Sequence, residues 1–128
     1  MSLNELSGLP PQEKRPNLVV DLSSFLGEGK SIEFREPTLG DLYPDQSLTE
    51  RLRITYPLMH NDQIVACIIM GKCYVKTADE AGQDSIRTMC AVLDKNPRIY
   101  LHIARQFNAE FMNVYTESLV ESKNDLTE

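Results

Sequence analysis

The segment Lys30–Leu42, KSIEFREPTLGDL, constrains the fold most, because the character of the sequence changes within it. Apolar and polar residues alternate over residues 31–35, which is the pattern of a short, half-buried strand. Pro37 ends the strand, since proline has no amide hydrogen to donate to a sheet. Thr38 and Asp41 then have the spacing of a helix start. The segment therefore predicts a strand that leads into a helical remainder.

The residues before this segment predict a β-hairpin. Asn17–Leu26 is mostly apolar and contains two adjacent valines, so it can pair as a strand with Ile32–Arg35. Gly27–Lys30 supplies two glycines, which can take positive φ and close the loop. A short helical turn over Ser23–Leu26 is the alternative for the end of this stretch.

Helices are expected after a short turn at Thr38–Tyr43. Ser47–Glu50 has the pattern of a capping box, which predicts a helix within Asp45–Met59 that Pro57 ends or kinks. Ile64–Met70 is apolar on all sides and predicts a buried helix, with a buried strand as the alternative. Gly71 is the expected stop of that helix.

Two further helices complete the expected fold. Asp84–Asp94 has an apolar stripe, and Pro97 suits the first position of a last helix after the cap Asn96. That helix is expected to have about 24 residues and a length of about 36 Å. Its four-residue repeat would wrap around a helix of 3.6 residues per turn. Either the helix is the backbone of the core, or part of its apolar stripe is left for a partner. The repeat consists of Ile99, Ile103, Phe107, Phe111, Tyr115 and Leu119.

The 128 residues suffice for one domain with a modest core. We expect a flexible N-terminal arm at residues 1–16, a single globular domain at 17–121 and a polar C-terminal tail at 122–128. The expected class is α+β and mainly α, with a short N-terminal β-hairpin packed on about four helices and a long C-terminal helix.

Composition excludes several kinds of partner. A net charge of −6 argues against nucleic-acid binding, and the basic residues Lys95, Arg98 and Arg105 are diluted by Glu110 and Glu117. No apolar run approaches the roughly 18 residues that a membrane span needs. Because the first residues lack the apolar core of a signal peptide, we expect a cytoplasmic protein with reduced cysteines.

Side chains that could carry chemistry are isolated in the sequence, so we predict no enzyme, no catalytic residues, no cofactor, no metal and no small-molecule substrate. The cysteine spacing does not fit a zinc site and favours buried thiols at Cys67, Cys73 and Cys90. The two histidines lack a neighbouring nucleophile motif and are expected at the surface. The carboxylates of Asp79, Glu80 and Asp84 do not follow the spacing of a calcium loop and are expected to be solvated.

Arg35 and Glu36 stand at the end of the predicted strand. They are expected to be either an exposed pair, worth less than about 1 kcal/mol, or the flank of an edge strand that a second chain could extend.

The segment Ile32–Leu42 resembles the opening of phage tail assembly chaperones. In that family a strand of the form hydrophobic-x-hydrophobic-Arg-Glu-Pro precedes Thr-x-x-Asp-Leu and a mostly helical remainder. The resemblance implies a non-enzymatic protein of the host cell cytoplasm that binds the tape measure protein, keeps it soluble and helps to recruit tail tube subunits. The alternative is a helical interaction or regulatory module without enzymatic activity.

A coating chaperone needs apolar contacts for its partner and for self-association, so a homo-oligomer is expected. The residues proposed for these contacts are Ile32, Phe34, Arg35, Phe107, Phe111, Tyr115 and Leu119.

Overall fold

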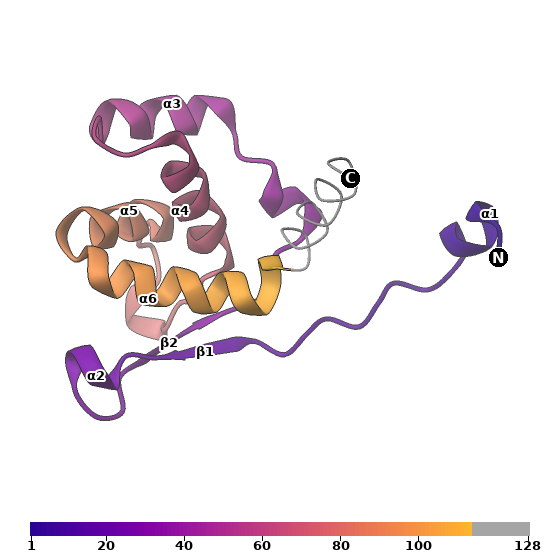
Figure 1. Ribbon diagram of the computed structural model, residues 1–128, viewed down its shortest axis with the longest axis horizontal. Coiled ribbons are helices and arrows are strands. Elements are labelled where there is room, and N and C mark those ends of the chain that lie inside the picture. The colour runs from indigo at the N-terminus through magenta and orange to yellow at the C-terminus, as the bar shows by residue number, and fades with distance from the viewer. Residues whose placement is uncertain (114–128) are drawn as a thin grey trace, which may run out of the picture.

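A computed structural model describes residues 1–113 of the chain (Figure 1). The described part contains a two-stranded antiparallel sheet of β1 (Leu18–Asp21) and β2 (Ser31–Phe34), and it confirms the expected α+β, mainly α class. Its helices are α1 (Leu3–Ser7), α2 (Ser23–Leu26), α3 (Gln46–Thr55), α4 (Asn61–Cys73), α5 (Ser85–Lys95) and α6 (Pro97–Phe107). Shorter helical segments are the 3-10 turns η1 (Leu39–Leu42) and η2 (Ala78–Glu80) and the π-helical stretch η3 (Asn108–Met112).

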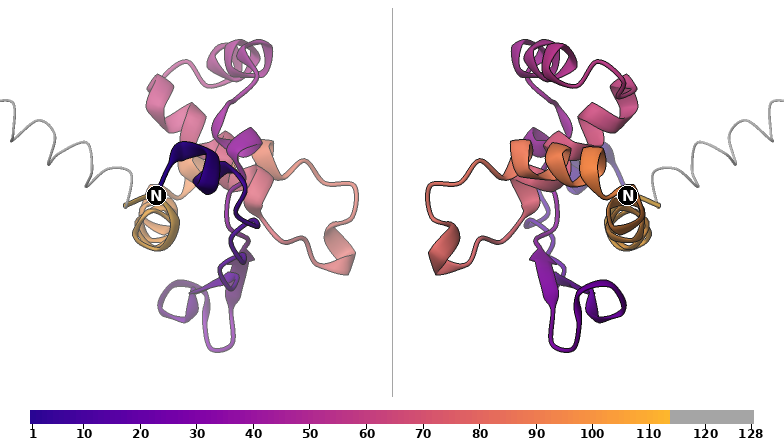
Figure 2. Two further views of the ribbon diagram at one scale, coloured as in Figure 1. Left: turned by 90° about the vertical axis from the view of Figure 1, so that its right-hand side faces the viewer. Right: turned by 90° about the vertical axis from the view of Figure 1, so that its left-hand side faces the viewer.

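Helix α4 lies at the centre of the fold and is contacted by α3, α5 and η1. Its buried side chains surround the helix, as expected for a segment that is apolar on all sides. Figure 1 shows α3 above α4 and the hairpin below α6, and Figure 2 shows the loop that contains η2 projecting from one side. The prediction of a buried helix over Ile64–Met70 is therefore confirmed.

The hairpin contains both of the structures that the sequence left open. β1 and β2 pair with Val20 opposite Ile32, and α2 occupies the first part of the connection between them. Gly27 and Gly29 have positive φ, which lets the chain turn back after α2. The inner face of the hairpin is fully buried at Val20 and Phe34.

The second edge of β2 is also paired. The amide of Arg35 donates to the carbonyl of Cys73 at 2.8 Å, and the amide of Val75 donates to the carbonyl of Glu33 at 2.9 Å. Tyr74 thereby forms an antiparallel bridge with Phe34. Of the two alternatives for Arg35 and Glu36, the edge strand that a second chain extends is wrong, because this edge of β2 is occupied within the molecule.

Three phenylalanines join the sheet to the last helix. The ring centroids of Phe34 and Phe107 lie 5.4 Å apart, and those of Phe107 and Phe111 lie 5.3 Å apart, both pairs edge to face. This chain of rings ties β2 to α6 and η3. The three rings lie inside the core.

Helix α6 begins at Pro97, as predicted, and continues without interruption into η3. A π-helical turn holds more residues than an α-helical turn, so η3 partly cancels the drift of the four-residue repeat. Phe107 and Phe111 consequently point into the same core. The part of the expected long helix beyond residue 113 lies outside the described residues.

Two helix boundaries differ from the prediction. Asp45, rather than Ser47, caps α3, because its carboxylate accepts the amide of Ser47 at 2.9 Å. Gly71 lies inside α4 rather than at its end. A Cβ at Gly71 would lie 2.6 Å from Cα of Ile86, so the glycine is there to let α5 approach α4 closely.

All three cysteines are buried, which confirms the prediction of core thiols. Cys67 lies on α4 and Cys90 on α5, and both are completely enclosed. Cys73 ends α4 beside β2. The thiols therefore belong to the packing between these elements.

Candidate functional site

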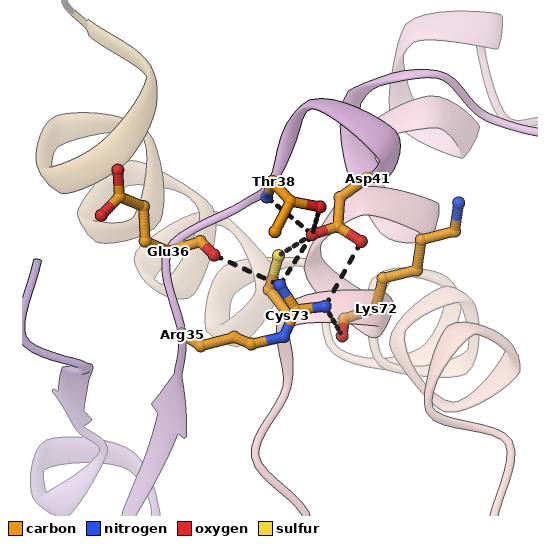
Figure 3. A network of polar contacts seen from close by, with 6 residues as sticks. All are labelled: Arg35, Glu36, Thr38, Asp41, Lys72 and Cys73. Atoms are coloured by element: carbon orange, nitrogen blue, oxygen red, sulfur yellow. Dashed lines mark hydrogen bonds and ion pairs between the residues drawn. The ribbon is translucent and has the colours of Figure 1, made fainter. Parts of the chain in front are cut away.

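The motif that resembles tail assembly chaperones forms a network of polar contacts, which we call the clasp (Figure 3). The guanidinium of Arg35 donates two hydrogen bonds to the carboxylate of Asp41, one of 2.7 Å from Nη1 to Oδ2 and one of 3.3 Å from Nη2 to Oδ1. Nη2 also donates to the carbonyl of Lys72 at 2.9 Å, in the last turn of α4. The clasp therefore connects the end of β2, the turn η1 and the end of α4.

Thr38 completes the clasp on the side of η1. Its amide and its hydroxyl both donate to Oδ2 of Asp41, at 2.8 and 2.9 Å. This is the helix start that the Thr38–Asp41 spacing predicts. The contact of Arg35 with the carbonyl of Lys72 also has a physical reason, because the carbonyl end of a helix is negative and attracts a guanidinium.

The electrostatics of the clasp favour a charged Asp41. The hydrogen bonds from Arg35 hold the pKa of Asp41 well below its usual range, and Thr38 adds to this effect although burial opposes it. The same bond raises the pKa of Arg35. Burial raises the pKa of the Cys73 thiol to about 11. A carboxylate with a lowered pKa and several hydrogen-bond donors is a poor proton acceptor near neutral pH, so the clasp is suited to holding the backbone rather than to acid–base chemistry.

A second turn repeats the pattern of the clasp at η2. Glu80 accepts hydrogen bonds from the amide and hydroxyl of Thr77, at 3.1 and 2.8 Å, and from the hydroxyl of Tyr74 at 2.5 Å. Burial and this hydrogen bond raise the pKa of Tyr74 to about 12. The acidic loop is thus partly structural, since Glu80 anchors η2 and Asp84 caps α5. The prediction that the carboxylates of this loop are solvated is therefore wrong for Glu80.

An apolar groove lies between the hairpin and the helices α5 and α6, and we call it the hairpin groove. It has a volume of about 300 Å³. Ile32 and Tyr74 line one wall, and the exposed side chain of Leu26 lies at its lip. Its other main lining residues are Leu22, Glu80, Met89, Val92, Ile99 and Ile103.

A second apolar groove lies between α4 and α6, and we call it the α4–α6 groove. Its volume is about 350 Å³. The α4 wall includes Val65, Ala66 and Ile69, and the α6 wall includes Leu101 and Ala104. Small side chains on facing helices leave the hollow, while Leu101 remains exposed at its rim.

The residues predicted for partner contacts separate into different roles. Phe34, Phe107 and Phe111 are 0%, 1% and 6% exposed, so their assignment to a contact surface is wrong and they belong to the core. Ile32 is half-buried in the wall of the hairpin groove, and Arg35 belongs to the clasp. Tyr115 and Leu119 lie outside the described residues.

Sequence reasoning missed Leu26 and Leu101, the exposed apolar side chains at the two grooves. Leu101 was detectable, because it falls off the apolar repeat of its helix. It lies on the polar face of the helix, where a leucine does not contribute to the core of the domain. Leu26 gave no such signal, since it continues an apolar strand-like run.

His102 also differs from its prediction as a surface residue. It is half-buried, and its imidazole Nε2 lies 3.0 Å from the carbonyl oxygen of Asp21, so it joins α6 to β1. His60 is exposed and precedes α4, as expected.

Residues 1–113 contain neither a cluster of metal ligands nor a helix that could span a membrane. No group of three or more His, Cys, Asp or Glu side chains gathers there as metal ligands would. Nor does any helix in that range combine the length and apolar character that crossing a bilayer requires. The described part of the chain does contain the two apolar grooves. In comparisons with known proteins, no family model matches the sequence, and no curated protein or solved structure is significantly similar to it.

Proposed function

We propose that this chain is a phage or prophage tail assembly chaperone. In this role it binds the tape measure protein in the host cell cytoplasm, keeps it soluble and helps to recruit tail tube subunits. It acts by binding and not by catalysis. The proposal starts from the resemblance of Ile32–Leu42 to the opening of that family.

The observation that carries the proposal is the hairpin groove. It is open and mostly apolar, and its polar lining residues include Glu80 and Gln83 in and after η2 and Thr88 on α5. An amphipathic helix binds such a groove by laying its apolar face into it. We assign the groove to a helical segment of the tape measure protein, with basic residues beside its apolar face to suit a chaperone of net charge −6.

The clasp supports this assignment because it shapes the groove. Ile32 on β2 and Tyr74 after α4 form one wall, and Arg35 holds these two segments together through Lys72 and Asp41. The clasp residues of the Ile32–Leu42 segment therefore act on the partner indirectly. They fix the wall that the partner would contact.

Co-expression tests the proposal. The long coiled-coil protein encoded just downstream, which the proposal takes as the tape measure protein, is expressed with and without this chain. The soluble fraction of that protein is measured. We expect the soluble fraction to rise several-fold and the two proteins to co-purify. Unchanged solubility would contradict the chaperone function and leave the alternative of a helical interaction module for another partner.

A substitution at the lip of the groove tests the binding site. Leu26→Asp places a charge where the apolar helix face is expected, so co-purification should be lost while the chaperone stays folded. Ile54→Asp is the matched control, because Ile54 is a similarly exposed apolar residue on α3 and lies outside both grooves. Equal loss with both variants would show that the hairpin groove is not the site.

A further inference from the structure

The N-terminal arm carries apolar side chains that its own chain does not cover. Leu3, Leu6 and Leu9 are 83%, 49% and 54% exposed. Leu3 and Leu6 are one turn apart on α1, and the amide of Leu9 donates to the carbonyl of Leu6 at 3.2 Å, which keeps the three leucines together. Removing exposed leucine side chains from water is favourable, so a partner surface that covers this tip would be bound.

The base of the arm is fixed to the domain. The amide of Arg15 donates to the carboxylate of Glu36 at 2.7 Å, and its guanidinium donates to the carbonyl of Glu110 and pairs with the carboxylate of that residue at 3.7 Å. Pro10 and Pro11 hold the chain beyond this anchor extended. Figure 1 shows the arm leaving the domain, with α1 at its far end.

The α4–α6 groove offers a matching surface. Its lining is mostly apolar, with Asp62 on the α4 side as its charged member, and Leu101 extends the apolar area onto the rim. Arg98 and Arg105 are exposed and lie three residues before and four residues after Leu101, so they share its side of α6. The rim along α6 is therefore basic, whereas the arm tip carries the exposed carboxylate of Glu5.

We propose that the arm of one copy docks in the α4–α6 groove of a second copy. Leu3, Leu6 and Leu9 contact the apolar lining, and Glu5 lies beside the arginines of α6. The hairpin groove is assigned above to the partner helix, and each groove has one acidic lining residue, Glu80 there and Asp62 here.

The contact is expected between copies and not within one. The anchored base and the extended proline segment direct the tip away from its own domain, whereas docking within one copy would need a sharp reversal at the prolines. Since each copy has one arm and one groove, the contact is heterologous and joins copies head to tail. It needs no other protein, so it is independent of the proposed function.

Sedimentation velocity over a range of concentrations tests the contact. The full chain should form dimers and larger species as concentration rises. Leu6→Asp on the arm and Leu101→Asp on the groove should each weaken association by at least tenfold, with melting temperatures unchanged because both side chains are exposed. Ile54→Asp should associate like the unmodified chain. Purely monomeric unmodified chain, or association that neither variant weakens, would overturn the proposal.

Disulfide trapping separates docking between copies from docking within one. Leu6→Cys and Ala104→Cys are made as single variants and mixed under mild oxidation, with the three native thiols buried and out of reach. The expected product is a cross-linked pair that contains one copy of each variant. A chain that carries both substitutions and cross-links only internally, at every concentration, would show that the arm folds back on its own groove.

Discussion

Arg35 and Asp41 are joined by two hydrogen bonds across the junction between β2 and η1, the shorter of them 2.7 Å. Asp41 is almost completely buried, whereas Arg35 is partly open to solvent. The pair holds the strand against the end of α4, because Arg35 also binds the carbonyl of Lys72.

Asp41→Asn should destabilise the fold by about 1–2 kcal/mol. The amide has no charge to offer Arg35 and weakens the bonds from Thr38, while solvent around Arg35 limits the loss. Urea unfolding followed by circular dichroism measures the change. Asp79→Asn is the control, since it removes the same charge from an exposed carboxylate in η2 and should change the stability by less than about 0.5 kcal/mol.

The contribution of Asp41 to stability should depend on pH in acid. Its pKa is lowered in the folded state, so the unfolded chain takes up a proton first, near its ordinary value of about 3.9. The stabilisation is fully present above that pH and is lost as the pH falls towards the folded pKa. The difference in unfolding free energy between the unmodified chain and Asp41→Asn should be constant from pH 5 to pH 7. It should narrow below about pH 4, and a difference that grew with acidity would contradict this account.

Gly71→Ala should destabilise the protein by about 1–3 kcal/mol, although alanine favours helices. The added Cβ would lie 2.6 Å from Cα and 2.8 Å from the amide nitrogen of Ile86, and backbone atoms cannot rotate away. Thermal unfolding gives the measurement. Gly40→Ala is the matched control, because the nearest atom to its Cβ would be 3.9 Å away, and it should leave the melting temperature nearly unchanged.

Phe107→Ala should cost about 3–5 kcal/mol in unfolding free energy. The ring is buried and packs edge to face against both Phe34 and Phe111, so its removal leaves a cavity at the junction of β2 and α6. Leu101→Ala, on the exposed side of the same helix, should cost less than about 1 kcal/mol. Similar losses for the two variants would mean that Phe107 is not the core residue that its burial indicates.

Local signals in the sequence were sufficient for much of the fold. The Thr38–Asp41 spacing predicted η1, Pro97 predicted the start of α6, and the continuous apolar run predicted the buried α4. Each of these depends on residues that are neighbours in the chain. The strand in the Lys30–Leu42 segment was predicted for the same reason.

Contacts between distant residues could not be predicted in this way. Gly71 looked like a helix stop because nothing nearby in the sequence shows that Ile86 packs against it. Arg35 looked exposed because its contact at Lys72 lies 37 residues away. Phe107 and Phe111 were assigned to a partner surface because a repeat of apolar residues does not tell which side of a helix the domain covers.

The pairing of Val75 with Glu33 has a consequence for aggregation. Strand edges with free amides and carbonyls are templates on which further chains stack into fibrils, and a two-stranded hairpin would ordinarily offer two of them. Here β2 is enclosed by β1 and by the segment after α4, so within residues 1–113 only the outer edge of β1 remains. At the end of this edge, the imidazole of His102 lies within hydrogen-bond distance of the carbonyl of Asp21. A chain with two apolar grooves on its surface thus limits the route by which it would polymerise through its own backbone.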